Sequence, residues 1–230
     1  MTNFLIGVPS PFDYRLVEKY QGLLDYDIIK PRYYKEVEAY KIMRNTFLDH
    51  GEYSHLVFAC SDVVIAQNHI ERLRLDIAEN PSLACITGYM NINLEYLDFY
   101  NITPNVVYPR QPVFSWYTDK TLPKEDIFEV KFSGFPIMCL KRSIVEKYEF
   151  QSTTDFTGDD GVYTGSLDTI LCWRFHRDNI PIFVDKRIKT LHLRELMSES
   201  QPTLVGIKEP FTEFKSNGKL TVLKVNTNTS

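Results

Sequence analysis

The sequence predicts an α/β protein with a mostly parallel central sheet flanked by helices. Short apolar runs alternate with segments of helical periodicity through most of the 230 residues, an order that is typical of parallel sheets. Several of the apolar runs are continuous rather than alternating, as in strands that are covered on both faces. Because 43% of the residues are apolar and 24% are charged, the chain can bury a core, and disorder of the whole chain is excluded.

The first half of the chain predicts an opening strand, three helices and two further strands. Pro9 and Pro11 stop the opening strand. Apolar side chains that recur at steps of three and four residues predict the helices, and continuous apolar runs too short for a helix predict the buried strands. In chain order, these elements are expected at residues 4–8, 15–24, 37–47, 55–60, 70–77 and 83–88.

The second half of the chain is less regular. Residues 89–126 are dense in Tyr, Phe, Trp and Pro, and we expect loops and irregular turns there. One strand is predicted over 130–140, and the acidic, glycine-containing stretch 153–161 is predicted to be a loop. The remaining elements are expected as helices at 143–148 and 166–178, strands at 180–184 and 188–193, and a β-hairpin at 211–225 around Asn217-Gly218.

These elements predict one main domain over residues 1–200. Residues 201–230 are expected to add a C-terminal hairpin extension and a disordered tail, since the chain ends in the polar sequence NTNTS. We find no internal repeat and no low-complexity tract.

The composition excludes several classes of protein. With 26 basic and 30 acidic residues the formal charge is −4, so nucleic acid is not an expected partner. The first twelve residues lack the pattern of a secretion signal, and no stretch approaches the ~20 apolar residues that span a bilayer. We therefore expect a cytoplasmic protein without a transmembrane segment. No CxxC pair is present, and four separate buried thiols are expected at Cys60, Cys85, Cys139 and Cys172.

Three polar residues are candidates for a functional site. Ser61-Asp62 follows a predicted buried strand, where ligands of open α/β sheets bind, and a carboxylate there can hold a hard cation. Asp168 lies in the first turn of a predicted helix, and His192 lies in an apolar strand. Taken singly, each has an ordinary structural explanation: a cap, a helix-dipole contact or a hydrogen-bonded core histidine.

The order of these residues resembles that of GT-A glycosyltransferases, which transfer a sugar from a nucleotide-sugar donor to an acceptor. The likeness covers about residues 3–195. Residues 43–46 (MRNT), followed by a strand and 60–63 (CSDV), look like the family's Arg-Asn helix and its Asp-x-Asp strand end. Residues 132–143 (FSGFPIMCLKRS) are similar to its glycine-containing strand. Residues 166–175 (SLDTILCWRF) and 191–193 (LHL) resemble its acidic-residue helix and its terminal metal-binding His.

This resemblance implies a single GT-A domain, which is Rossmann-like, and assigns roles to individual residues. Asp168 is expected to be the general base of an inverting enzyme. Asp62 and His192 are expected to hold Mn²⁺ or Mg²⁺ against the diphosphate of a UDP- or GDP-sugar, because an oxygen-plus-imidazole site without thiolates suits these ions better than zinc. The residues expected to bind the donor are Pro9, Arg44, Asn45, Ser61, Asp62 and Gly134.

Two residues depart from the family's pattern. Cys60 stands where the first Asp of the Asp-x-Asp pair is usual, and Leu167 stands where another polar or acidic residue commonly precedes Asp168. Both departures bear on metal binding and on catalysis. Asp159-Asp160 would compensate only if the predicted loop brings them to the site, and solvated turn acids are the simpler explanation.

Two other functions are compatible with the sequence. A non-catalytic module that binds a nucleotide or a glycan is supported by Cys60, and turnover of a nucleotide-sugar would eliminate it. A nucleotidyltransferase also holds a metal with carboxylates on an α/β sheet, but residues 7–11 (GVPSP) lack the basic phosphate loop expected there. The acceptor, whether protein, glycan or lipid, is not indicated by the sequence.

Overall fold

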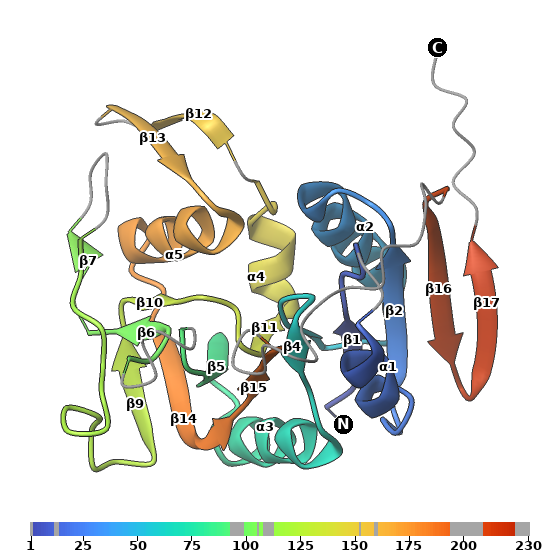
Figure 1. Ribbon diagram of the computed structural model, residues 1–230, viewed down its shortest axis with the longest axis horizontal. Coiled ribbons are helices and arrows are strands. Elements are labelled where there is room, and N and C mark those ends of the chain that lie inside the picture. The colour runs from blue at the N-terminus through green and yellow to red at the C-terminus, as the bar shows by residue number, and fades with distance from the viewer. Residues whose placement is uncertain are drawn as a thin grey trace.

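The computed structural model describes residues 2–11, 14–92, 99–104, 106–107, 113–151, 153–158, 161–193 and 209–223. The helices are α1 Arg15–Gln21, α2 Glu36–Asp49, α3 Gln67–Glu79, α4 Arg142–Lys147 and α5 Leu167–Arg177 (Figure 1). The strands are β1 Phe4–Gly7, β2 Asp27–Arg32, β3 His55–Phe58, β4 Val63–Val64, β5 Cys85–Tyr89, β6 Ile102–Thr103, β7 Val106–Val107, β8 Val113–Phe114, β9 Ile127–Val130, β10 Phe132–Ser133, β11 Met138–Lys141, β12 Thr153–Gly158, β13 Gly161–Gly165, β14 Ile182–Lys189, β15 Leu191–His192, β16 Phe211–Ser216 and β17 Lys219–Leu223.

The centre of the fold is a nine-stranded mixed sheet in the order β17-β16-β2-β1-β3-β11-β5-β14-β9. Strands β2, β1, β3, β5 and β14 run in one direction, while β11, β9 and β16 run against them. Helices cover both faces of the sheet (Figure 1). The predicted α/β class with a mostly parallel central sheet is therefore confirmed.

The two faces of the sheet carry separate cores because successive strand residues point to opposite sides. Leu5 and Leu56 face one core, where apolar residues of α2, α4 and α5 gather. Ile6 and Val57 face the other core, which α3 covers. The helical stripes read from the sequence thus mark the sides that pack on the sheet. No helix in the described part of the chain is long and apolar enough to cross a membrane.

The bounds or the type of several elements in the second half of the chain were predicted wrongly. The single strand expected over 130–140 is divided among three short strands, β9, β10 and β11. The chain bends at Gly134–Pro136 before it enters β11, which pairs with β3 and β5. The loop expected at 153–161 contains the paired strands β12 and β13. The two strands expected between 180 and 193 are one long strand, β14, and the short β15.

The C-terminal hairpin forms where the sequence predicts it. Asn217 and Gly218 have φ values of 50° and 74°, which is the backbone of a type I′ turn. The hairpin is joined to the main domain, since β16 pairs antiparallel with β2, a strand that the sequence analysis missed. Asp159, Asp160 and the tail 226–230 lie outside the described residues.

The four cysteines are free thiols, and Cys85, Cys139 and Cys172 are buried, as expected. Cys60 is partly buried and lies beside the candidate site.

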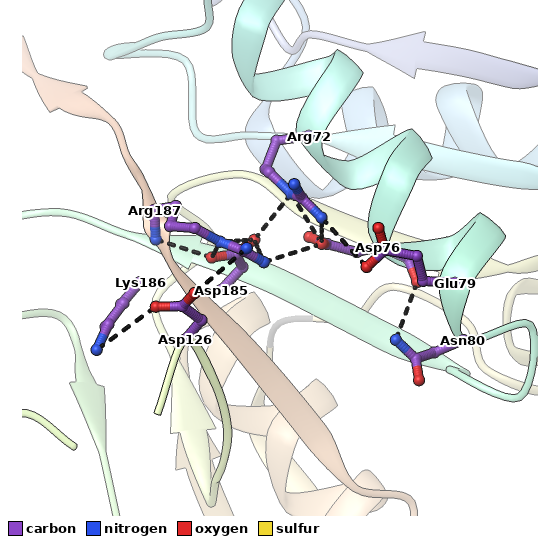
Figure 2. Close-up of polar contacts among 8 residues, drawn as sticks. All are labelled: Arg72, Asp76, Glu79, Asn80, Asp126, Asp185, Lys186 and Arg187. Atoms are coloured by element: carbon purple, nitrogen blue, oxygen red, sulfur yellow. Dashed lines mark hydrogen bonds and ion pairs between the residues drawn. The ribbon is translucent and has the colours of Figure 1, made fainter. Parts of the chain in front are cut away.

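A buried charge cluster joins α3 to β14 (Figure 2). The side chains of Asp76 and Asp185 have no exposed surface. Arg72 Nε donates to Asp76 Oδ1 at 2.9 Å and lies 3.3 Å from Asp185 Oδ2. Arg187 Nη2 reaches Asp185 Oδ2 at 2.8 Å and Asp76 Oδ1 at 3.2 Å. Two guanidinium groups thus balance two desolvated carboxylates, as buried charges require.

The two acids of this cluster differ in pKa. Burial raises the pKa of Asp76 to about 6, and the neighbouring Asp185 acts in the same direction. Burial also disfavours ionisation of Asp185, but its hydrogen bonds from Arg187 hold its pKa below the usual value. Asp76 is therefore the member of the pair that takes up a proton first as the pH falls.

Replacement of Asp76 by Asn should remove a pH dependence of stability. Because the folded protein holds the Asp76 proton more tightly than the unfolded chain does, its stabilising contribution is complete below pH about 4. That contribution is lost as the pH rises through the folded pKa of about 6. Between pH 4 and 7, the unfolding free energy of the parent should fall relative to that of Asp76→Asn by an amount on the order of 2 kcal/mol.

Chemical denaturation at several pH values measures this difference. Glu79→Gln is the matched control, because Glu79 is an exposed acid on the same helix that also approaches Arg72, at 3.6 Å. Parallel pH curves for the parent and Asp76→Asn would contradict the assignment.

Candidate functional site

The candidate site lies at the carboxyl ends of β1, β3 and β5. Pro9 and Ser10 follow β1, Ser61 and Asp62 follow β3, and the chain that leads into β11 crosses the same edge, because Met138 pairs with both Phe58 and Thr87. The carboxyl edge of parallel strands is where open α/β sheets bind ligands. Pro9, Ser61, Asp62 and Gly134 are all in this region, and their expected binding of a donor stays a prediction.

Backbone contacts fix the bend before β11. Cys60 N donates to Phe135 O at 3.0 Å, and Cys60 Sγ lies 3.6 Å from Gly134 O. Phe135 has a φ of 53°, a left-handed conformation that is unusual for an aromatic residue. Its buried ring packs edge-on against Phe58, with the centroids 5.0 Å apart. This packing stabilises the strained turn and brings Gly134 to the edge of the sheet.

Asp168 stands over this bend in the first turn of α5. Its Oδ1 accepts from Thr169 N at 2.7 Å and from the Ser166 hydroxyl, so this oxygen pairs with a backbone N–H in the first turn of the helix. The other oxygen, Oδ2, lies 3.5 Å from the point where a Cβ on Gly134 would stand. Burial raises the pKa of Asp168, while the hydrogen bonds from Ser166 and Thr169 oppose the rise. One oxygen is therefore committed to structure and the other faces the site.

Three carboxylates act on one another here. Burial raises the pKa of Glu36, and the charges of Asp168 and then Asp62 raise it further. Burial also raises the pKa of the Cys60 thiol, and the charges of Asp62, Asp168 and Glu36 add to this rise. Cys60 is therefore a neutral thiol surrounded by acids, and it cannot supply the negative charge of the Asp that it replaces.

Asp62 and His192 meet, as predicted. His192 lies in β15, which pairs with β4, and Leu193 N donates to Asp62 O at 2.8 Å. His192 Nε2 is 3.2 Å from Asp62 Oδ2. The side chains come from segments 130 residues apart, so their approach is a property of the fold.

The donor set for a metal ion is small. Within the described ranges no group of three or more His, Cys, Asp or Glu side chains is arranged to hold an ion. Asp62 and His192 nevertheless fit two ligands of one octahedral ion, since an oxygen and a nitrogen at adjacent corners lie about 3 Å apart when each bond is about 2.1 Å. Such a pair needs further oxygen ligands from a substrate.

Arg44 and Asn45 are the predicted site residues that lie elsewhere. Arg44 Nε donates to Val145 O at 2.9 Å and to Tyr148 O at 3.1 Å, and its Nη2 donates to Glu146 O at 3.0 Å. The guanidinium thus fastens α2 to the C-terminal end of α4. Asn45 is exposed on the same helix. Glu36 is more than two helical turns away from Arg44, about 12 Å along the axis.

Two polar residues near Asp168 were not found from the sequence. Glu36 opens α2 after an irregular turn, and nothing in its neighbourhood marks it among 30 acidic residues. Asn101 lies in the aromatic segment that was expected to form loops, and its side chain is buried against Gly134. Only the tertiary fold brings either residue to the site.

Comparisons with known proteins support the fold alone. No protein-family model matches the sequence, and a comparison with curated proteins finds no match. The crystal structure of A197 from STIV is similar over 100% of this chain and 98% of that chain, with a TM-score of 0.53 and 18% identity. CMP:2-keto-3-deoxy-manno-octonic acid synthetase complexed with CTP is 11% identical over 86% of this chain and 77% of that chain, but its TM-score of 0.43 is too low to support a conclusion.

Glu36→Gln tests the grouping of the carboxylates. The raised pKa of Glu36 means that its stabilising contribution is present below pH about 4 and is lost as the pH rises through the folded value. At pH values above the folded pKa, Glu36→Gln should therefore be more stable than the parent, and the gain should be small because Glu36 is exposed and solvent screens its charge. Thermal unfolding at pH 5 and pH 8 measures this gain.

The matched control is Glu38→Gln, an exposed acid in the same first turn of α2. The control should show no such gain. Equal behaviour of the two variants would show that Glu36 does not interact with Asp62 and Asp168.

Proposed function

We propose that the protein is a glycosyltransferase of the GT-A type that transfers a sugar from a nucleotide-diphosphate sugar to an acceptor hydroxyl. The observation that supports the proposal is the contact of His192 Nε2 with Asp62 Oδ2 at 3.2 Å at the carboxyl edge of the parallel strands, together with the position of Asp168 beside Gly134 at the bend that crosses this edge. The match with A197 from STIV adds support for the fold only. The order of the sequence motifs adds support for the function.

Asp168 has the environment of a general base. Its Oδ1 is held by the helix terminus, so the carboxylate has a fixed orientation, and Oδ2 points towards Gly134. Burial raises its pKa, which makes the carboxylate a stronger base than an exposed one. In an inverting transfer, Oδ2 of Asp168 would take the proton of the acceptor hydroxyl while the oxygen of that hydroxyl bonds to the anomeric carbon. The bond from that carbon to the diphosphate breaks, and its electron pair leaves with the diphosphate.

Asp62 and His192 would hold a divalent cation, Mn²⁺ or Mg²⁺, with the diphosphate as the source of the other ligands. When bound, the cation would stabilise the negative charge of the departing diphosphate. Since the described residues offer no group of three or more ligands, metal and nucleotide should bind together rather than singly.

A binding module without catalysis is the second candidate. The neutral Cys60 thiol favours it, because the carboxylate that usually occupies this position is absent. Turnover of a nucleotide-sugar separates the two candidates.

The joint binding of metal and nucleotide has a direct test in Asp62→Asn. Calorimetry should show that Mn²⁺ raises the affinity of the parent for UDP or GDP by about tenfold or more relative to EDTA, and that this gain is lost in Asp62→Asn. Asn keeps the size of the side chain and removes its charge. Asp49→Asn is the control, because Asp49 is an exposed acid at the far end of α2. Identical affinities of the parent in Mn²⁺ and EDTA would contradict the metal site.

Asp168→Asn tests the chemistry. The amide oxygen can still accept from Thr169 N, but the amide cannot take up the proton, so turnover of the nucleotide-sugar should fall by ~10² to 10⁴ while donor affinity and Tm remain near those of the parent. Release of UDP or GDP from UDP- or GDP-sugars measures turnover, with Asp49→Asn again as the control. Unchanged turnover would remove Asp168 from the catalytic step, and a joint loss of rate and donor affinity would instead place it against the donor sugar.

A further inference from the structure

A pocket of about 470 Å³ lies where α2, α4 and α5 meet, on the face of the sheet that these helices cover. Figure 1 shows α4 between the other two helices. Sites for small molecules commonly have volumes of this order. Arg44 lines the pocket about 12 Å from Glu36 along the axis of α2, so the pocket is separate from the candidate site. Four of its lining residues are cations: Arg44, Lys147, Arg174 and Arg177.

Arg44 has only uncharged partners among the described residues. Its Nε and Nη2 donate to the carbonyls of Val145, Glu146 and Tyr148. No described carboxylate forms an ion pair with it, and its Nη1 donates to no described residue. A guanidinium does not lose its proton in a protein, and it carries five N–H donors. The charge of Arg44 and part of its donors are therefore left for an anion.

Arg174 approaches the chain that follows α4 from the other side, on α5. Its Nη1 donates to Glu149 O at 3.0 Å, and its Nη2 donates to Gln151 Oε1 at 2.6 Å. Burial lowers the pKa of Arg174, and the positive charge of Arg177 lowers it further, although the charges of Glu149 and Asp178 oppose the change. The surroundings of Arg174 thus disfavour its charge, and an anion in the pocket would stabilise it.

The acids that line the pocket do not balance its cations. Asp178 is shared by two of them, since Lys147 Nζ lies 2.9 Å from its Oδ2 and Arg177 Nε lies 2.8 Å from its Oδ1. The other two acids, Glu146 and Glu149, are exposed, and solvent screens their charges. The lining therefore has an excess of positive charge, which favours an anionic ligand.

We propose that this pocket binds a small phosphomonoester, with Arg44, Arg174 and Arg177 as the cations that hold its phosphate group. Guanidinium groups form paired, charge-assisted hydrogen bonds with phosphate oxygens. The pocket is larger than one phosphate ion, so it has room for the organic part of the ligand. The inference does not rest on the proposed function, because Asp62, Asp168 and His192 are not among the residues that line this pocket.

Calorimetric titration with glucose 6-phosphate, glycerol 3-phosphate and inorganic phosphate tests the pocket. The titrations are made in EDTA, so that no cation at Asp62 and His192 binds the phosphate, and at constant ionic strength. At least one of the two phosphomonoesters should bind with a Kd of about 1 mM or lower, and more tightly than inorganic phosphate. Arg44→Gln and Arg177→Gln should each weaken this binding by about tenfold or more, because each removes a cation from the pocket.

Two arginines outside the pocket are matched controls. Arg142 donates to backbone carbonyls at the end of another helix, as Arg44 does, so Arg142→Gln should cost similar stability but leave the binding unchanged. Arg74 is exposed and pairs with an acid of its own helix at 2.9 Å, much as Arg177 pairs with its neighbouring acid at 2.8 Å. Arg74→Gln should therefore also bind the phosphomonoester like the parent. Since Arg177 is exposed, Arg177→Gln tests the pocket even if Arg44→Gln does not fold.

Each outcome supports or overturns the inference. Weaker binding in the two pocket variants alone supports it. A parent that binds neither phosphomonoester overturns it, as does a parent whose binding is matched by Arg177→Gln or is weakened equally by the two control changes. Tighter binding of inorganic phosphate than of both phosphomonoesters would assign the pocket to the free ion and overturn the ligand class. The assay contains no metal and no nucleotide-sugar, so its failure leaves the proposed function standing.

Discussion

The site depends on the insertion of one antiparallel strand between two parallel ones. Strand β11 lies between β3 and β5, so the chain that enters it must cross their carboxyl edge. The bend is fixed by the bonds from Cys60 N to Phe135 O and from Gly88 N to Ile137 O. Without this insertion, Gly134 would not reach the edge where Asp62 and Asp168 lie. The left-handed backbone conformation of Phe135 is the local strain that accompanies this bend.

The insertion also determines the electrostatics of the edge. Cys60 lies under the bend and is desolvated, so it stays neutral and does not add a fourth acid to Glu36, Asp62 and Asp168. Partial burial raises the pKa of Asp168 in the same place. The pair Asp62 and His192 is supplied from the other side by β15, which follows the long strand β14. Groups from five separate segments thus meet at one edge.

The sequence analysis predicted the elements that depend on a local residue pattern and missed those that depend on pairing between distant segments. Helical stripes and apolar runs gave the α/β class, and Asn217-Gly218 gave the hairpin turn. Strand β2 was missed because it contains Pro31, a residue that discourages a strand assignment, although β2 pairs on both sides. The expected single strand over 130–140 failed because Gly134 to Pro136 form a bend that only long-range contacts with Cys60 determine.

The same distinction applies to the site. Asp62, Asp168 and His192 stood at positions with a recognisable order in the sequence, and the fold brings them to one edge. The same order of motifs predicted that Arg44 binds the donor, but its guanidinium donates hydrogen bonds to backbone carbonyls at the end of α4. Glu36 and Asn101 had no signal, because their role depends on neighbours more than 30 residues away in the chain, Asp168 for the first and Gly134 for the second.

The most direct test of the central claim is a crystal structure of the protein with a nucleotide-diphosphate sugar and Mn²⁺. The account predicts density for the diphosphate beside Asp62 and His192, with the anomeric carbon of the sugar on the side of Asp168. Density for the nucleotide at any other part of the surface, with this edge of the sheet empty, would contradict the account.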